Sequence, residues 1–133
     1  MEGVKLLSRT EEQDVEVSRE DQAKINQFSK LTTNLEILQA KYDEVSKEKQ
    51  YLEDLELELE LLDEDTKLDY KIGDAFVLLS HEEAMQRIEQ EKEAAQETTD
   101  SLNKEIETVA STLDSLKSEL YKKFGNSINL DKD

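Results

Sequence analysis

The chain has 133 residues, of which 35% are apolar and 38% charged, and its formal net charge at pH 7 is −17. An average globular domain has about 45–50% apolar and about 25% charged residues, so this chain cannot fill a large spherical core, and its balance suits a long helix or coiled coil. Its 34 acidic residues oppose 17 basic ones without a basic patch, which argues against nucleic-acid binding because that requires clustered Lys and Arg.

The first predicted element is a helix over residues 18–64, preceded by a flexible N-terminal segment, 1–17. SRED at 18–21 matches the capping-box pattern, in which a Ser caps a backbone N–H and an acid three residues later bonds back. Apolar residues then recur at alternating spacings of four and three, which is typical of a coiled-coil seam. After a polar interruption at Lys49 the seam resumes, and its members are Leu31, Leu35, Leu38, Tyr42, Val45, Leu52 and Leu59.

The run LELELELL at 55–62 alternates with period two, a pattern that strands also show. Leu and Glu are strong helix formers and no β-branched residue is present, so we interpret the run as helix. On a helix its Leu residues occupy several faces, which indicates burial by more than one neighbour. The run therefore predicts assembly near this end of the helix.

Residues 67–79 are predicted to form a β-hairpin. Leu68, Tyr70 and Ile72 alternate with polar residues, as in a half-buried strand, and Gly73-Asp74 fits a two-residue turn that needs Gly first. The strand AFVLL at 75–79 is apolar on both faces. Because an isolated two-stranded hairpin is marginal in water and has open edges, strands from other chains are expected to complete it. The residues expected to serve subunit assembly are Leu68, Tyr70, Ile72, Gly73, Phe76, Val77, Leu78 and Leu79.

The second helix is predicted over 80–124 and antiparallel to the first, because the connection between them is short. SHEE at 80–83 is a second capping box, and Gly125 fits the position just after a helix end. A flexible tail, 126–133, is expected to follow. The seam comprises Leu102, Ile106, Val109, Leu113, Leu116 and Leu120, preceded more thinly by Ala84, Ile88, Glu91, Ala95 and Thr98. The predicted fold class is mainly α, a long antiparallel two-helix coiled coil joined by one β-hairpin.

Enzymatic chemistry is not indicated by the sequence. The single histidine, His81, begins a helix without a visible catalytic partner, and we interpret it as a surface helix residue. Two helices offer no pocket that would shift the pKa values of paired carboxylates, and no P-loop, GxGxxG or HExxH motif is present. We therefore expect no enzyme activity, no metal and no cofactor. No stretch approaches the ~20 apolar residues of a membrane span either.

The order of long helix, single β-hairpin and long helix in an acidic chain resembles the β-type subunits of the prefoldin family. Three segments carry the resemblance: VSREDQAKINQFSKL at 17–31, YKIGDAFV at 70–77 and LYKKFGNSINLD at 120–131. They are similar to the signature segments of the subunit 4 group of that family, and the resemblance covers about residues 15 to 131. It implies the β type, since an α-type subunit would carry two hairpins.

The resemblance implies a subunit of a hetero-hexameric co-chaperone that works without ATP. Hairpins of the six subunits would form β-barrels, from which the helical pairs would extend as coiled coils. The implied partners are other prefoldin subunits of the α and β types, the cytosolic chaperonin, and unfolded actin and tubulin. The implied location is the cytoplasm.

If residues 63–79 form a closed end, the opposite helix termini form an open end, where Phe28 lies near Leu116 and Ile25 near Leu120. The resemblance implies that clients are held there. For Ile25, Phe28 and Leu120, closure of the seam and client contact are both open interpretations. For Phe124, Ile128 and Leu130 we favour client contact, because no second helix is expected to cover them.

A second function is compatible with the same sequence. A structural coiled-coil adaptor, or tether, would dock one folded partner through the hairpin. The two hypotheses differ in client range, because a chaperone holds chemically unrelated unfolded proteins whereas a tether binds one folded protein.

Overall fold

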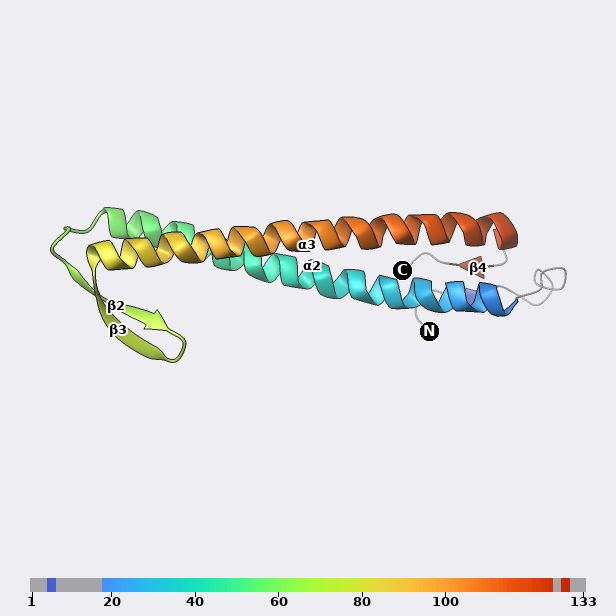
Figure 1. Cartoon of the computed structure of the whole chain (residues 1–133), viewed down its shortest axis with the longest axis horizontal. Helices are drawn as coiled ribbons and strands as arrows, with labels where there is room; N and C mark the ends of the chain where they lie inside the picture. The colour runs from blue at the N-terminus through green and yellow to red at the C-terminus, as the bar shows by residue number, and fades with distance from the viewer. Residues whose placement is uncertain (1–4, 7–17, 126–127, 130–133) are drawn as a thin grey trace. The chain divides into compact units, whose positions relative to one another are not determined.

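The computed structural model describes residues 5–6, 18–125 and 128–129. The chain divides into two compact units, a hairpin unit, Lys41–Asn103, and a terminal unit, Met1–Ala40 with Lys104–Asp133. The long helices are α2, Arg19–Glu60, and α3, His81–Phe124, and the antiparallel strands β2, Lys67–Ile72, and β3, Ala75–Ser80, connect them (Figure 1). The predicted fold class is confirmed. Two short strands that the sequence did not predict, β1, Lys5–Leu6, and β4, Ile128–Asn129, pair antiparallel in the terminal unit.

Both long helices begin with a capping box, as predicted. At the start of α3 the Ser80 N–H donates to Glu83 Oε1 at 3.1 Å, and the Glu83 N–H donates to Ser80 Oγ at 3.1 Å. The hydrogen bonds from Ser80 hold the pKa of the Glu83 carboxyl below its ordinary value. Ser18 and Asp21 make the equivalent exchange at the start of α2. Each box satisfies backbone N–H groups that have no partner within the helix.

Helix α2 ends at Glu60, earlier than the predicted residue 64. Its last turn contains no basic residue, and carboxylates at a helix C-terminus oppose the helix dipole. Beyond the helix, the Asp65 N–H donates to Asp63 Oδ1 at 3.2 Å and the Thr66 N–H donates to the Asp63 carbonyl at 2.9 Å. Such local bonds offer the backbone an alternative to the helix, so the acidic run forms a turn.

The hairpin has the predicted turn and register. Ile72 pairs with Ala75 and Tyr70 pairs with Val77, which leaves a two-residue turn at Gly73-Asp74. Gly73 has a φ of 62°, the left-handed conformation that the first residue of this turn requires and that glycine adopts without steric cost. Within β2, Leu68, Tyr70 and Ile72 are less exposed than the residues between them, so the predicted alternation is confirmed.

In the hairpin unit the two helices run antiparallel around an apolar cluster. Lys92 Nζ lies 3.1 Å from Glu56 Oε1, and Lys49 hydrogen-bonds Gln96. The hairpin cluster consists of Leu52, Leu59, Tyr70, Ala84 and Ile88, with Leu55, Leu68, Ile72, Leu79 and Met85 packed against it. The hairpin and both helices therefore share one core.

The polar part of the seam differs from the prediction at one position. Thr99 is buried and Thr98 is exposed. The seven residues from Ala95 to Leu102 can be divided as three and four, through Thr98, or as four and three, through Thr99, and the helix uses the second division. The buried Thr99 hydroxyl donates to the Gln96 carbonyl at 2.9 Å, which satisfies its hydrogen-bonding capacity. Lys49, the predicted polar interruption of the seam, is half-buried and hydrogen-bonds Gln96.

The capping box at the start of α3 gives a stability prediction. Ser80→Ala removes the acceptor for the Glu83 N–H, so we expect the free energy of unfolding to fall by about 1 kcal/mol. Ser101→Ala, at an exposed position inside the same helix, is the matched control and should change stability by less than about 0.5 kcal/mol. Urea unfolding followed by circular dichroism measures both variants, and equal effects would contradict the capping role.

Candidate functional site

The hairpin is fixed to α3 by Tyr70. Its side chain is 8% exposed, and its hydroxyl donates to Glu91 Oε2 at 2.7 Å. Burial, together with this bond to a carboxylate, raises the pKa of the Tyr70 hydroxyl, so the group is a neutral donor at physiological pH. Arg87 Nε lies 3.4 Å from the other Glu91 oxygen. Tyr70 therefore fixes the orientation of β2 in two ways, through its buried ring and through its hydrogen bond to Glu91.

The eight residues predicted to serve assembly divide into two groups. Leu68, Ile72 and Leu79 pack against the hairpin cluster around Tyr70, and Gly73 forms the turn. The others are exposed apolar side chains of β3: Phe76, Val77 and Leu78. Phe76 and Leu78 are 69% and 61% exposed and lie opposite Lys71 and Asp69 in the ladder. Strand β3 thus presents apolar surface that this chain does not cover.

His81 has a contact that the sequence analysis missed. Its Nε2 donates to the Leu59 carbonyl at 2.6 Å, one of the carbonyls at the end of α2 that lack a partner within the helix. The start of α3 is thereby bonded to the end of α2. The only sequence feature that pointed there was the position of His81 directly after the hairpin, which predicts no particular acceptor.

The terminal unit has its own apolar cluster at the paired ends of the helices. The terminal cluster consists of Ile25, Phe28, Leu116, Leu120 and Phe124, with Leu31, Leu113 and Tyr121 packed against it. The predicted proximity of Phe28 to Leu116 and of Ile25 to Leu120 is confirmed. Four residues predicted to be at the client-binding tip, namely Ile25, Phe28, Leu120 and Phe124, therefore lie together and buried.

The expectation that no second helix covers Phe124 is wrong. Phe124 is 3% exposed because α2 begins at Arg19, early enough for its first turns to lie beside the end of α3. Lys123 bonds Asp21 in that first turn. Ile128 lies in β4, and its side chain and the whole of Leu130 lie outside the described residues.

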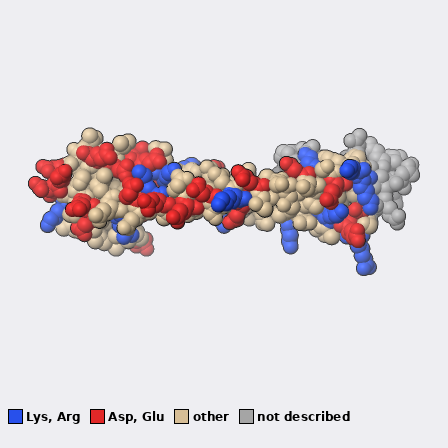
Figure 2. Space-filling model, turned by 45° about the horizontal axis from the view of Figure 1, so that its top comes forward, with Lys and Arg blue, Asp and Glu red and all other residues tan. Residues whose placement is uncertain are grey.

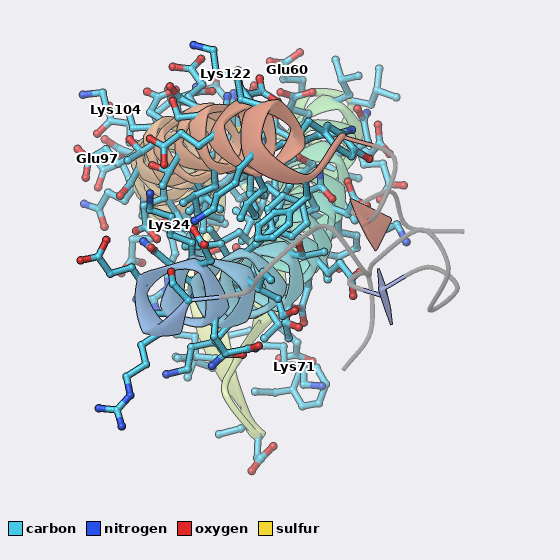
Figure 3. All side chains as sticks on the ribbon, turned by 90° about the vertical axis from the view of Figure 1, so that its right-hand side faces the viewer. Lys24, Glu60, Lys71, Glu97, Lys104 and Lys122 are labelled. Carbon is cyan, nitrogen blue, oxygen red and sulfur yellow. The ribbon has the colours of Figure 1, made fainter. Side chains whose placement is uncertain are left out.

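Two ion pairs border the terminal cluster. Lys123 pairs with Asp21, and Lys24 Nζ lies 3.1 Å from Glu119 Oε2. In Figure 3, Lys24 extends from α2 on the side that faces α3, whereas Lys122 extends from α3 away from α2. Lys123 holds the pKa of the Asp21 carboxyl below its ordinary value, and Glu119 raises the pKa of Lys24. Both pairs favour the antiparallel arrangement that buries Phe28 and Phe124.

Acidic side chains cover much of the face drawn in Figure 2. In the parts of the chain that the structure describes, no group of three or more His, Asp or Glu side chains is arranged to hold a metal ion. None of the helices described has the length and apolar character required to cross a membrane.

Comparison with known proteins assigns these features to a family. A family model described as "Prefoldin subunit" matches residues 22–127. Prefoldin subunit 4 of Saccharomyces cerevisiae is 36% identical over 129 residues, which cover 97% of this chain and 100% of the yeast protein. Prefoldin subunit 4 of Homo sapiens is 37% identical over 128 residues, covering 96% of each chain. The chain belongs to the prefoldin family.

The prefoldin fold is supported by a solved structure as well. The crystal structure of the prefoldin beta subunit from Thermococcus strain KS-1 matches with a TM-score of 0.73, over 83% of this chain and 96% of that one, at 15% sequence identity. Membership in the prefoldin family gives the chain a chaperone-type subunit role and association with other prefoldin subunits. The exposed strand β3 is consistent with a chain that functions as one subunit of several.

The ion pair of Asp21 gives a prediction for pH dependence. Because its folded-state pKa is lowered, ionised Asp21 stabilises the fold above about pH 4, and this contribution is lost as the pH falls through the lowered pKa. Asp21→Asn keeps the size of the side chain and removes its charge. We expect Asp21→Asn to have a lower thermal midpoint than wild type at pH 7. The difference between the two midpoints should narrow below about pH 4, and circular dichroism measures both.

Asp114→Asn is the matched control for this experiment. It removes one negative charge from an exposed position on α3, so it reports the effect of net charge without the loss of an ion pair. Equal midpoints for the two variants at pH 7, or a midpoint difference between Asp21→Asn and wild type that does not narrow at all below about pH 4, would contradict the assigned role of the Asp21–Lys123 pair.

Proposed function

We propose that the chain is one subunit of a hetero-hexameric co-chaperone of the cytoplasm that works without ATP. The complex captures unfolded proteins, actin and tubulin among them, and delivers them to the cytosolic chaperonin. The observation that carries this proposal is the match to prefoldin subunit 4 along nearly the whole chain, 97% of it against the yeast protein.

We assign assembly to the hairpin. Phe76 and Leu78 are exposed on one face of β3 and Val77 on the other, and exposed apolar surface of this kind marks sites of protein interaction. The edges of a two-stranded sheet are also open to pairing with further strands. Hairpins of neighbouring subunits would cover this surface and continue the sheet, which explains why the chain places its most exposed aromatic side chain on this strand.

We assign client holding to the terminal unit, and two sources of apolar contact are available there. The tail carries Ile128 and Leu130, and the terminal cluster carries Ile25, Phe28, Leu120 and Phe124. Exposing one fully buried side chain of this kind costs about 1.5–3 kcal/mol, so a client would use the cluster only after opening it. We therefore propose the tail as the first contact and the cluster as a reserve of apolar surface.

Phe76→Asp tests the assembly surface. In the isolated chain Phe76 is largely exposed, so the substitution should leave the helix content unchanged. In an assembled complex it would bury an unpaired carboxylate, which costs several kcal/mol, and we expect the variant to be lost from the complex. Ile37→Asp, the same change of chemistry on an exposed residue of the terminal unit, is the control and should assemble normally.

Size-exclusion chromatography with the partner subunits, together with far-ultraviolet circular dichroism, measures both outcomes. Normal incorporation of Phe76→Asp would refute assembly through β3. A chain that binds no other prefoldin subunit and instead docks one folded protein through the hairpin would support the tether function in place of the co-chaperone.

Client holding is tested by shortening the tail. A chain that ends at Gly125 keeps Phe124 and the terminal cluster but lacks Ile128 and Leu130. We expect complexes with this chain to assemble fully and to suppress aggregation of denatured actin less well at equal complex concentration. Because the load would be shared among subunits, trimming the tails of several subunits together should enlarge the loss.

Light scattering during dilution of denatured actin, and of a second denatured protein of unrelated sequence, gives the readout. Loss of protection for both clients is the result expected of a chaperone. If complexes with every tail trimmed protect both clients as well as intact ones, Ile128 and Leu130 do not hold clients.

A further inference from the structure

The end of α2 exposes leucine side chains on a hydrogen-bonded backbone. Leu57, Leu61 and Leu62 are 60%, 87% and 42% exposed. Leu57 lies in the last turn of α2, and the turn continues as the Leu61 N–H donates to the Glu58 carbonyl at 3.2 Å and the Leu62 N–H to the Leu59 carbonyl at 3.1 Å. The neighbouring Leu59 is buried in the hairpin cluster, so these three are the leucines of the LELELELL run that the cluster leaves out.

These leucines are separate from the assembly surface of β3. His81, which directly follows β3, bonds the Leu59 carbonyl, so the end of β3 lies beside the end of α2. Phe76 lies four residues earlier on β3, about 13 Å along the strand at ~3.3 Å per residue. Figure 1 shows the hairpin turn at the far end of the strands from the end of α2. Covering Phe76 therefore does not by itself cover Leu57 and Leu61.

The charge around the leucines is of one sign. Between Lys49 and Lys67 the sequence has no basic residue and eight acidic ones: Glu53, Asp54, Glu56, Glu58, Glu60, Asp63, Glu64 and Asp65. Glu56 pairs with Lys92, and in the described part of the chain the other seven form no ion pair. Figure 2 shows acidic side chains gathered over this end of the hairpin unit, on the left of the view. The exposed leucines are thus surrounded by carboxylates, which give this surface a negative electrostatic potential.

We propose that Leu57, Leu61 and Leu62, with the carboxylates beside them, form a docking surface for a basic amphipathic segment of a partner protein. We call it the acidic leucine surface. The leucines would supply apolar contact, and the carboxylates would select Lys and Arg on the partner and accelerate its approach. Such a partner would bind the assembled complex at a position distinct from both the hairpin contacts and the client-holding region.

Charge complementarity decides the kind of occupant. A second copy of this chain would bring the same carboxylates face to face, and like charges across an interface oppose association. An uncharged apolar segment would cover the leucines but leave seven carboxylates without ion pairs. A helical segment with an apolar face flanked by basic residues satisfies both, because the flanking Lys and Arg lie beside the leucines when the apolar face is docked.

The test uses the assembled complex and a defined probe, a fluorescent helical peptide of about 18 residues with Leu along one face and Lys on both flanks of that face. Fluorescence anisotropy gives its affinity. Leu57→Ser with Leu61→Ser should weaken binding about tenfold or more, since two apolar contacts are lost. Ile37→Ser, at an exposed apolar position of the terminal unit, is the control and should have no effect.

A charge-matched pair of variants separates this surface from general attraction to an acidic protein. Glu58→Gln with Glu60→Gln should weaken peptide binding about threefold or more at low salt. Glu105→Gln with Glu107→Gln removes the same charge from exposed positions of α3 in the terminal unit and should change affinity by less. These variants alter no buried group, so they test the proposal even if the leucine variant folds poorly.

Three results would overturn the proposal. Equal affinity for the double Leu→Ser variant and wild type would show that the leucines make no contact. Equal losses for the two glutamate pairs would show attraction to net charge alone. Failure of a well-folded Leu57→Ser, Leu61→Ser chain to join the complex would show that a neighbouring subunit, and not an external partner, covers these leucines.

Discussion

The buried contact between Tyr70 and Glu91 decides which face of the hairpin is turned towards the helices. Tyr70 and the residues of β2 on its face pack into the hairpin cluster, and its hydroxyl bonds α3. Since side chains alternate along a strand, packing the Tyr70 face against the helices leaves the side chains of the opposite face pointing away from the core. The cross-strand register leaves Phe76 and Leu78 out of the core. A prefoldin chain with the hairpin turned over would bury Phe76 and expose Tyr70, so one contact determines both the core and the exposed apolar face of β3.

The exposed apolar side chains are concentrated in the hairpin unit. It holds Tyr51, Leu57, Leu61, Leu62, Phe76, Val77 and Leu78, whereas in the described part of the terminal unit Ile37 is the large apolar side chain that remains exposed. The terminal unit instead closes its apolar cluster and borders it with the pairs of Asp21 and Lys24. Exposed ion pairs contribute only about 0–1 kcal/mol each, so the terminal cluster is held closed mainly by burial of its apolar side chains, at about 1.5–3 kcal/mol each. The hairpin unit thus leaves apolar side chains exposed, whereas the terminal unit buries its own and opens only by exposing them.

The sequence predicted the elements well because each had a strong local pattern. The capping boxes, the alternation of Leu68, Tyr70 and Ile72, and the glycine turn all rely on neighbours within a few residues. The seam pairing of Phe28 with Leu116 followed from antiparallel geometry. The errors have two sources: the helix end at Glu60 depends on local turn hydrogen bonds to Asp63 that compete with the helix, and the burial of Phe124 depends on its long-range packing in the terminal cluster with Ile25 and Phe28. Strands β1 and β4, of two residues each, are too short to show any period, and their pairing joins the two ends of the chain.

The negative charge of the chain affects which parts of its surface can make apolar contacts. Carboxylates are spread along both helices, and in the described residues only a few of them pair with lysine or arginine across the helix interface. An unfolded client that collapsed onto the helices would need to bring compensating basic groups along their whole length. In the described residues, exposed apolar side chains are concentrated at β3 and at the end of α2, with Tyr51 and Ile37 elsewhere on α2, whereas the terminal cluster is buried. The charge therefore disfavours apolar contact along most of the helix surface and leaves β3 and the end of α2 as the exposed apolar surfaces on which the proposals for assembly and docking rest.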